Sequence, residues 1–292
     1  MTAWKPREDW LREAVASVLA ERECDIELVL IDDGNDLPIR DMLADVSDPS
    51  LRVIRIAHGG HYAARNAGLK AARGDYARFF DADDVAVEGS TGRLLAAAQA
   101  HGPGTAAYGW TQMCDDQLAP YRLLSGDCQG DVVEDFLLNR FDVYIHGILF
   151  PRAALDRVGA WNETYRLMGD RDFVLRAFEQ APVCRLAEAV TLYRRHPASI
   201  TRSASAADAV RAGLQVLEDY FARHPEHRGS NLERTAYKNL HLLRCRQFLR
   251  LRDFPAAIRQ LALAARRDPA AVTALVLRSL ARRVTRSRRR TP

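Results

Sequence analysis

Hydrophobic and polar positions follow a helical period at the start of the chain and then change to a strand pattern. Apolar residues recur at helical spacing from Trp10 to Leu19, and Asp9 stands where a helix N-cap is expected. Residues 26–33 (IELVLIDD) form a nearly continuous apolar run, which predicts a short strand buried on both faces. This pattern indicates a helix followed by a buried strand.

The same alternation continues as far as residue 81. Residues 38–46 (PIRDMLADV) and 63–73 (AARNAGLKAAR) predict helices, whereas residues 51–56 (LRVIRI) and 76–81 (YARFFD) predict strands. Strands that alternate with helices are typical of an α/β fold with a mainly parallel sheet flanked by helices. Such sheets bind ligands at the carboxyl ends of their strands. The aspartates at these ends either cap loops or hold a ligand: Asp32, Asp33, Asp81, Asp83 and Asp84.

After Thr201 the pattern becomes entirely helical. Residues 203–224, 233–251 and 254–269 each carry an amphipathic stripe, and the last two resemble one tetratricopeptide-type hairpin with its turn at Arg252 and Asp253. Residues 205–292 hold 19 Arg or Lys against 7 Asp or Glu, whereas residues 1–204 are net acidic. We therefore expect two regions, 1–204 and 205–292, and a frayed basic tail over residues 282–292.

The composition excludes several classes of protein. Hydrophobic residues make up 48% and charged residues 27% of the 292 positions, which excludes a disordered or fibrous chain. No apolar run approaches the roughly 20 residues of a transmembrane helix, and the first ten residues lack the apolar core of a signal peptide. The five cysteines lie far apart without a CxxC pair, which argues against a zinc site or disulfides and favours the cytoplasm.

The motif with the clearest chemistry is FFDADDV at residues 79–85. It places three carboxylates at the end of a predicted strand, and Asp81 and Asp83 point the same way if the chain is extended. Hard divalent cations such as Mg²⁺ or Mn²⁺ prefer oxygen ligands and leave room for substrate phosphates. The segment therefore predicts either a metal–nucleotide site or a solvated turn in which the aspartates cap a helix.

Several motifs in order resemble the family 2 glycosyltransferases of GT-A fold. They are an aspartate pair before Gly34, a GGHYAARNAG segment, a Gly-Asp-Tyr lead-in and the DADD box. Residues 146–178, which end in an acidic motif before a helix, and residues 192–201 (LYRRHPASIT) are similar to later segments of that family. The resemblance covers about residues 2–201. It implies a GT-A-type catalytic domain over residues 1–204, followed by an all-helical basic extension over residues 205–292.

The resemblance implies an inverting glycosyltransferase that moves a sugar from a nucleotide diphosphate, with a UDP-sugar as donor, to an acceptor hydroxyl. The acceptor would be a glycan, a lipid-linked glycan or another cell-envelope precursor. On the donor side, Asp33 would accept a hydrogen bond from the uracil N3–H, and Thr2 and Trp4 would flank the base. Arg65 would bind the diphosphate, and Asp81 would contact the ribose or the metal.

The family also implies a metal and a general base. Asp83 would be the principal ligand of Mg²⁺ or Mn²⁺, while Arg194, His196 and Ser199 would close over the diphosphate or the metal. Asp170 matches the acidic residue that serves as base, but Gly169 stands where the family has Glu. The motif GDRD therefore leaves open whether Asp170 or Asp172 is the base.

One departure concerns the start of the chain. In the family, a buried strand of the type VSVIIP precedes the segment that here follows Met1, and it lies in the middle of the sheet. The resemblance therefore predicts a gap at the nucleotide-binding edge, from either a start codon assigned too far downstream or a truncated chain. Codons upstream of Met1 would then encode a Val/Ile-rich strand.

Two other functions fit some of the same residues. The DADD box also resembles the nucleophile motif of haloacid dehalogenase-type phosphatases, but none of the three lysines lies between Asp81 and Asp170, where that chemistry needs one. A non-catalytic binding protein with a degenerate glycosyltransferase domain is the second alternative, favoured by Gly169 and the missing strand.

The sequence also leaves undecided what the basic helical region binds. Interleaved aromatics and a known nucleic-acid motif are missing from it, so no nucleic-acid partner is expected. It forms either a solvated arginine-rich cap or a surface that lies against anionic lipid, peripherally at the inner face of the membrane.

Overall fold

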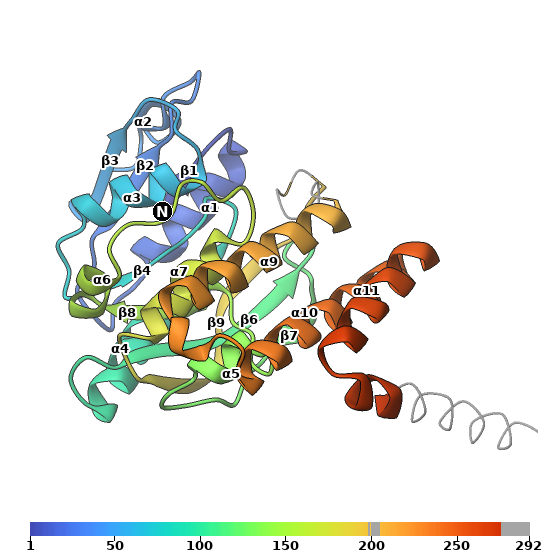
Figure 1. Ribbon diagram of the computed structural model, residues 1–292. Coiled ribbons are helices and arrows are strands. Elements are labelled where there is room, and N and C mark those ends of the chain that lie inside the picture. The colour runs from blue at the N-terminus through green and yellow to red at the C-terminus, as the bar shows by residue number, and fades with distance from the viewer. Residues whose placement is uncertain (198, 200–204, 276–292) are drawn as a thin grey trace, which may run out of the picture. The chain divides into compact units, whose positions relative to one another are not determined.

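Strand β2 (Leu28–Asp32) is buried because a helix packs on each of its faces (Figure 1). Leu28 and Leu30 share a core cluster with residues of α1 (Glu8–Leu19), whereas Val29 and Ile31 cluster with Ala64 of α3 (His61–Ala71). Successive side chains of a strand point to opposite faces, so an uninterrupted apolar run can fill both cores. The strand predicted from this run is confirmed.

The structure is a computed structural model that describes residues 1–197, 199 and 205–275. The chain forms two compact units, of which the first comprises residues 1–136 and 140–203 and the second residues 137–139 and 204–292. Besides α1 and α3, the first unit contains further helices. They are α2 (Ile39–Met42), α4 (Ser90–His101), α5 (Val133–Leu137), α6 (Arg152–Val158), α7 (Gly169–Phe178) and the 3₁₀ turn η1 (Ile145–Gly147).

Two sheets form the framework of the first unit. The first has the parallel order β1 (Thr2–Ala3), β2 and β3 (Leu51–Arg55). The second has the order β4 (Tyr76–Arg78), β8 (Ile148–Pro151), β6 (Ala106–Cys114), β9 (Val183–Arg194) and β5 (Val85–Ala86), with β7 (Pro120–Leu124) beside β6. Thr2 connects the two sheets, because it pairs with Ile31 and also forms a bridge to Asp81.

The strand directions refine the expectation of a mainly parallel sheet. The pairs among β1, β2 and β3 are parallel, and so is the pair of β6 with β9. The pairs β4–β8, β6–β8, β6–β7 and β5–β9 are antiparallel. The α/β class with a helical C-terminal extension is confirmed. The antiparallel pairs all involve β7, β8 or β9, which follow the part of the sequence whose alternation was analysed.

Helix α1 starts differently from the sequence expectation. It begins at Glu8, and Arg7, whose side chain makes no capping hydrogen bond, occupies the N-cap. The N-cap prediction for Asp9 was therefore wrong. Asp9 lies in the first turn and accepts hydrogen bonds from the Arg7 guanidinium, and its charge there is favourable to the helix dipole.

The second unit contains the predicted C-terminal helices. They are α9 (Ala206–Arg223), α10 (Asn231–Arg250) and α11 (Phe254–Arg267), with the short turn η2 (Pro225–His227) after α9. The hairpin turn at Arg252 and Asp253 is confirmed, and Asp253 caps α11 by accepting a hydrogen bond from the Ala256 amide. The basic tail at residues 282–292 lies outside the described residues. Within the described ranges, no helix has the length and apolar character needed to span a membrane.

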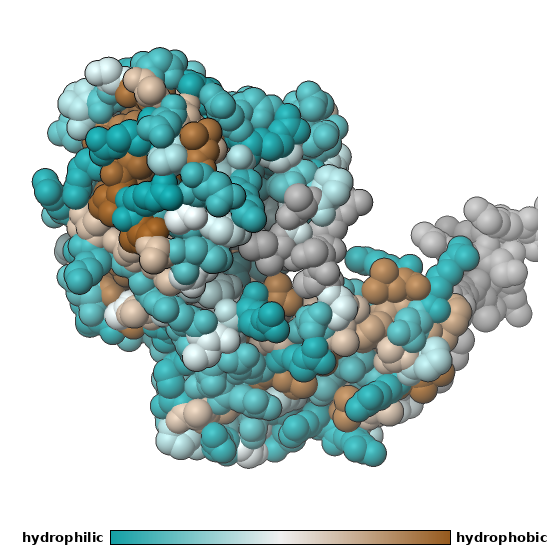
Figure 2. All heavy atoms as spheres, turned by 90° about the horizontal axis from the view of Figure 1, so that it is seen from above, coloured by the Kyte–Doolittle hydropathy of each residue, from teal (hydrophilic) through white to brown (hydrophobic). Residues whose placement is uncertain are grey.

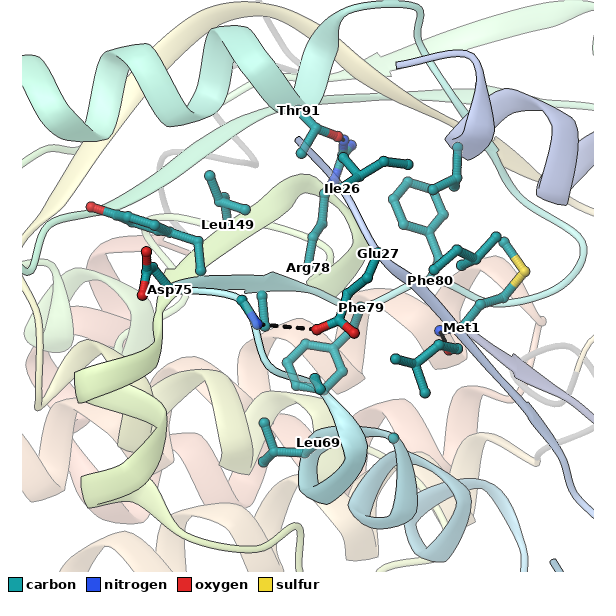
Figure 3. Close-up of a pocket in the computed structure, with 18 of the residues that line it drawn as sticks. Met1, Ile26, Glu27, Leu69, Asp75, Arg78, Phe79, Phe80, Thr91 and Leu149 are labelled. Carbon is teal, nitrogen blue, oxygen red and sulfur yellow. Dashed lines mark hydrogen bonds between the residues drawn. The ribbon is translucent and has the colours of Figure 1, made fainter. Parts of the chain in front are cut away.

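A cavity of about 500 Å³ lies between β2 and β4 (Figure 3). Its walls are mainly apolar and include Met1, Val29, Leu69, Phe79 and Leu149. The amino group of Met1 donates a hydrogen bond to the Val29 carbonyl, and burial lowers its pKa to about 5. The cavity therefore lies beside the first residue, where the family resemblance predicts a gap in the sheet.

The backbone groups beside this cavity are placed so that an additional strand could pair with them; we call this a strand site. Along β2, the Leu28 amide donates to Ser50 on the β3 side, whereas the Ile31 amide donates to the Met1 carbonyl on the opposite side. Because backbone groups of a strand alternate between its two edges, the Val29 amide points toward the cavity. On the other wall, the Phe80 carbonyl already accepts from the Thr2 amide. An extended segment could therefore continue β1 backward between the two walls.

We expect a Val/Ile-rich pentapeptide fused in front of Met1 to stabilise the protein. The peptide would bury apolar side chains in the cavity and pair with the free edge of β2, with a gain of about 2 kcal/mol. For a domain of this size that gain corresponds to a rise in Tm of roughly 4–8 °C. Thermal unfolding should be compared with a Gly/Ser pentapeptide fusion. Equal melting temperatures would contradict a strand site.

Candidate active site

The DADD segment follows β4 and turns its carboxylates toward several cationic side chains. Asp81 accepts hydrogen bonds from Arg65 Nη2 at 3.1 and 3.3 Å, from His146 Nε2 at 3.0 Å and from the Thr2 hydroxyl at 3.3 Å. Burial disfavours the carboxylate, but Arg65, His61 and His146 outweigh it and hold the pKa of Asp81 well below its usual value. Asp81 is therefore a fixed negative charge at the centre of the site.

Asp83 is paired with the histidine that the sequence predicted. His196 Nε2 lies 2.9 Å from Asp83 Oδ2, and the ring rests against Trp10 at a centroid distance of 4.7 Å. Burial and the neighbouring charge of Asp81 raise the pKa of Asp83. The side chain of Asp83 is still one-third exposed, so a ligand can reach it. The structure thus brings Asp83 and His196 together across 113 residues of sequence.

His146 connects the first and third aspartates of the motif. Its Nε2 contacts Asp81, and its Nδ1 lies 3.0 Å from Asp84 Oδ2. The backbone carbonyl of His146 accepts from Arg78 Nε at 2.8 Å and from the Thr191 hydroxyl at 3.0 Å, which holds η1 in place. Burial opposes a charge on the ring, but Asp84 and Asp81 raise the pKa of His146. His146 Nδ1 and Asp84 Oδ2 lie at an ion-pair distance, but neither buried atom makes a hydrogen bond within the described residues.

Arg65 is held by an aromatic stack. Its guanidinium lies 4.7 Å above the Trp161 ring, which stacks on Phe173 of α7 at 3.8 Å and on Tyr62 at 5.7 Å. The Arg65 side chain is 2% exposed. Its Nε and Nη1 atoms are buried and have no hydrogen-bond partner among the described residues. Because buried guanidinium donors are costly to leave unpaired, these two atoms indicate a place for an anionic ligand.

Asp33 lies at the end of β2 and organises the loop before α3. Its Oδ1 accepts from the Gly59 amide at 2.8 Å, and its Oδ2 accepts from the Gly60 amide at 3.1 Å and lies 2.9 Å from His58 Nδ1. Asp33 is buried, so these contacts use its oxygens within the protein. Asp33 therefore fixes the loop of residues 58–60 before α3, and its predicted contact with the donor base stays a prediction.

Trp4 forms one wall beside this loop. Its ring stacks on His58 with centroids 3.6 Å apart and planes 14° from parallel, and the side chain is 43% exposed. A base that stacked on Trp4 would use its outer face or displace His58. The predicted stacking of a base on Trp4 stays a prediction.

Asp170 and Asp172 differ sharply in their surroundings. Asp172 is 3% exposed and pairs with Arg176 Nε at 2.9 Å, one turn further along α7. Asp170 is partly exposed and Asp172 is buried, so only Asp170 has a side chain that solvent can reach. Burial raises the pKa of the neighbouring Tyr62 to about 12, and the charge of Asp170 adds to this shift. Which of the two aspartates is the base stays a prediction.

The packing of Tyr62 explains Gly169. A Cβ atom on Gly169 would lie 2.6 Å from Tyr62 Cζ, so the ring leaves no room for a larger residue. The Tyr62 hydroxyl accepts a hydrogen bond from the Gly169 amide at 2.8 Å. The glycine is therefore a packing partner of Tyr62, and its presence at this position does not by itself indicate a degenerate site.

Two predicted ligand-binding residues have other tasks in the structure. Arg194 is buried, and its guanidinium donates to the Asp83 carbonyl at 3.0 Å, to the Asp116 carbonyl at 2.6 Å and to Glu13. It supports the DADD turn from behind, so the expectation that Arg194 closes over the diphosphate needs correction. Ser199 accepts from the His196 amide at 3.4 Å, and its neighbours 198 and 200–204 lie outside the described residues.

Sequence analysis missed His146, Tyr62 and the role of Asp84. Asp84 is 1% exposed and accepts from the Arg194 amide at 2.9 Å, while burial raises its pKa well above the usual value. His146 and Tyr62 stand inside segments that were noted only for their overall similarity. Their sequence spacing does not show that η1 places His146 against Asp81 and Asp84, or that α3 places Tyr62 against Gly169.

The donor groups of this site suit a divalent cation. Ligand atoms of Asp81, Asp84 and His146 lie within 4.8 Å of one another, and the pair Asp83–His196 is adjacent to them through the same turn. Carboxylate oxygens with imidazole nitrogen suit Mn²⁺, and carboxylates alone suit Mg²⁺. The carboxylates of Asp81 and Asp83 are also only partly buried, as a ligand of such a cation must be.

The fold and this site agree with the comparisons with known proteins. Residues 3–159 match the profile of Glycosyl transferase family 2, which is more than half of the chain. The chain belongs to glycosyl transferase family 2. This membership excludes the phosphatase alternative, since the DADD box, the Arg65 segment and β1–β3 all lie within the matched family domain.

Named relatives in the family come from bacteria. The uncharacterized glycosyltransferase EpsJ of Bacillus subtilis is 31% identical over 205 residues, which cover 66% of this chain and 60% of EpsJ. A PGL/p-HBAD biosynthesis glycosyltransferase of Mycobacterium bovis is 31% identical over 166 residues, covering 55% of this chain and 61% of that protein. The chain thus spans about three-fifths of the length of these relatives.

Solved structures show the same fold. The structure of Staphylococcus aureus TarS residues 1–349 in complex with UDP-GlcNAc superposes with a TM-score of 0.62 at 17% identity, covering 92% of this chain and 80% of TarS 1–349. The complex of the same TarS fragment with UDP gives a TM-score of 0.58. Family and fold together confirm the GT-A-type resemblance drawn from the motifs.

Proposed function

We propose that this protein is an inverting, metal-dependent glycosyltransferase that uses a UDP-sugar as donor. The observation that carries the proposal is the convergence of Arg65, with two buried unpaired donor atoms, on the carboxylate of Asp81 beside the Asp83–His196 pair. This group supplies what a leaving diphosphate needs, namely positive charge and carboxylates for a cation. The UDP-GlcNAc and UDP complexes of TarS support a UDP-sugar as the donor.

The reaction we propose is a single in-line displacement. The acceptor hydroxyl oxygen attacks the anomeric carbon, the bond from that carbon to the diphosphate oxygen breaks, and its electron pair leaves with UDP. Asp170 takes the hydroxyl proton as general base. One displacement inverts the configuration at the anomeric carbon. Mg²⁺ or Mn²⁺ bound to Asp83, Asp81 and His196 would supply charge against the leaving diphosphate.

Binding of the nucleotide part follows from the loop before α3. Trp4 supplies a stacking surface, and Asp33 shapes the base pocket by holding the amides of Gly59 and Gly60. Thr2 lies beside Asp81, where the ribose would approach. Arg65 would donate to the diphosphate from its guanidinium group, of which Nε and Nη1 make no hydrogen bond within the described residues.

The acceptor and the location complete the proposal. We infer a glycan, a lipid-linked glycan or another cell-envelope precursor as acceptor, which the envelope-related names of the bacterial relatives support. For the location we propose the cytoplasm, because five widely spaced cysteines without a CxxC pair are typical of a reduced chain. Residues 1–204 would form the catalytic domain and residues 205–292 a basic helical region.

A panel of nucleotide sugars tests the donor. Thermal unfolding should be recorded with UDP-, GDP-, ADP- and dTDP-sugars, each with Mn²⁺ and with EDTA. A donor at 100 times its Kd stabilises the native state by about 2.7 kcal/mol, so a UDP-sugar should raise Tm by several degrees and lose most of this effect in EDTA. A shift with GDP-sugars alone would overturn the UDP assignment. Binding without any sugar transfer to envelope acceptors would favour the non-catalytic alternative.

A further inference from the structure

The turn between α10 and α11 exposes a group of large apolar side chains. Leu249 is 48% exposed, Leu251 62%, Phe254 57% and Ile258 68%. Figure 2 shows brown, apolar side chains among teal, hydrophilic ones on the part of the molecule that contains these helices. We call Leu249, Leu251, Phe254 and Ile258 the apolar tip. Four large apolar residues so exposed within ten positions are unusual for a surface in water.

The backbone of the turn holds this tip in place. Arg252 has a left-handed conformation with φ of 60°, and the Asp253 amide donates to the Phe248 carbonyl at 3.0 Å, which ends α10 sharply. Asp253 then starts α11 as its N-cap. As a result Phe248 and Ala257 point into the hairpin core, whereas Phe254 and Ile258, four positions apart, lie on the same outer face of α11.

The charges around the tip are mostly positive. Arg246, Arg250, Arg252 and Arg259 are all exposed beside it. Residues 234–267 contain nine Arg or Lys and a single acidic residue, Asp253, whose carboxylate already caps the Ala256 amide. Apolar side chains ringed by arginines complement a surface that has anionic headgroups above a hydrocarbon layer.

We propose that the α10–α11 turn is a docking site for an anionic lipid bilayer, with the apolar tip inserted below the headgroups and the four arginines bound to their phosphates. A lipid surface fits better than a protein groove because the tip is a protruding turn with charges around it. Long arginine side chains can reach the phosphates while the leucines and Phe254 enter the acyl region. The inference concerns only the second unit and does not depend on the proposed transferase activity.

Vesicle sedimentation of the full chain tests the proposal. Binding should be measured on phosphatidylcholine vesicles and on vesicles with about 30% phosphatidylglycerol, at low and high salt. Anionic vesicles should bind the protein strongly at low salt and at least tenfold more weakly in 0.5 M NaCl, since salt screens the arginines. Neutral vesicles should bind weakly under both conditions.

Two sets of substitutions separate the apolar and the charged contributions. The triple change Leu251→Ser, Phe254→Ser and Ile258→Ser should lower binding to anionic vesicles about tenfold or more, and so should Arg246→Gln with Arg250→Gln and Arg259→Gln. Matched controls in the first unit are Tyr121→Ser with Leu123→Ser, whose side chains are 55% and 43% exposed, and these should leave binding unchanged. All changes are at exposed positions, so unfolding curves should coincide with that of the parent chain.

Three results would overturn the proposal. Vesicle binding that survives both triple changes would place the lipid contact elsewhere. Loss of binding only on removal of residues 282–292, with the tip variants unaffected, would assign it to the basic tail. The third result is that the parent chain does not bind vesicles but self-associates in sedimentation velocity. If the apolar triple change abolishes that association, the tip binds a second copy of the chain instead.

Discussion

Replacing Asp83 by Ala should abolish metal-dependent donor binding and sugar transfer together. Asp83 is the carboxylate nearest His196 and is accessible, whereas Asp84 of the same box is buried against His146. Loss of a principal cation ligand removes the charge that faces the leaving diphosphate in both the bound state and the transition state. We expect donor affinity in Mn²⁺ to fall to the value measured in EDTA, and kcat/KM to fall by about 10²–10³-fold.

Direct Mn²⁺ binding distinguishes this loss from misfolding. The Asp83→Ala protein should bind Mn²⁺ far more weakly in an electron paramagnetic resonance titration while its Tm stays close to that of the parent. Asp36→Ala, an exposed aspartate in the loop after β2, is the matched control and should bind Mn²⁺ normally. If Asp83→Ala retains Mn²⁺-dependent donor binding, the cation is held by Asp81, Asp84 and His146 instead.

Replacing Asp170 by Asn should stop transfer without weakening donor binding. The amide keeps the size of the side chain and removes its basicity, so the attacking hydroxyl loses its proton acceptor. We expect kcat to fall by about 10²–10⁴-fold, the usual contribution of a general base, while the donor Kd changes little. Pre-steady-state turnover and a thermal-shift titration with the UDP-sugar measure the two quantities separately.

Asp172→Asn is the comparison within the same helix turn. Asp172 is buried and pairs with Arg176, so its loss leaves a buried cation without its partner and should lower Tm. Turnover per folded molecule should stay within about tenfold of the parent value. The opposite pattern, in which Asp172→Asn is inactive and Asp170→Asn is fully active, would make Asp172 the base. Normal activity in both variants would contradict the mechanism proposed here.

Local sequence was sufficient for most helices and strands between residues 10 and 81 and for the C-terminal helices, but not for β1 or for the N-cap of α1. Periodicity reports which side chains are apolar on a helix face or along a strand, so β2, α3 and the α10–α11 hairpin could be predicted from it. The order of the motifs was sufficient for the family. The same motifs identified Asp81, Asp83 and His196 as site residues, and the structure brings these three near one turn.

Only the tertiary structure decided how long-range partners meet. Strand direction in the second sheet depends on how the chain returns to β4 and β6, which a local pattern does not encode. Packing likewise placed His146 between Asp81 and Asp84, turned Arg194 behind the DADD box and filled the space beside Gly169 with Tyr62. The sequence by itself determined which chemical groups the protein has, whereas burial and geometry decided which of them a ligand can reach.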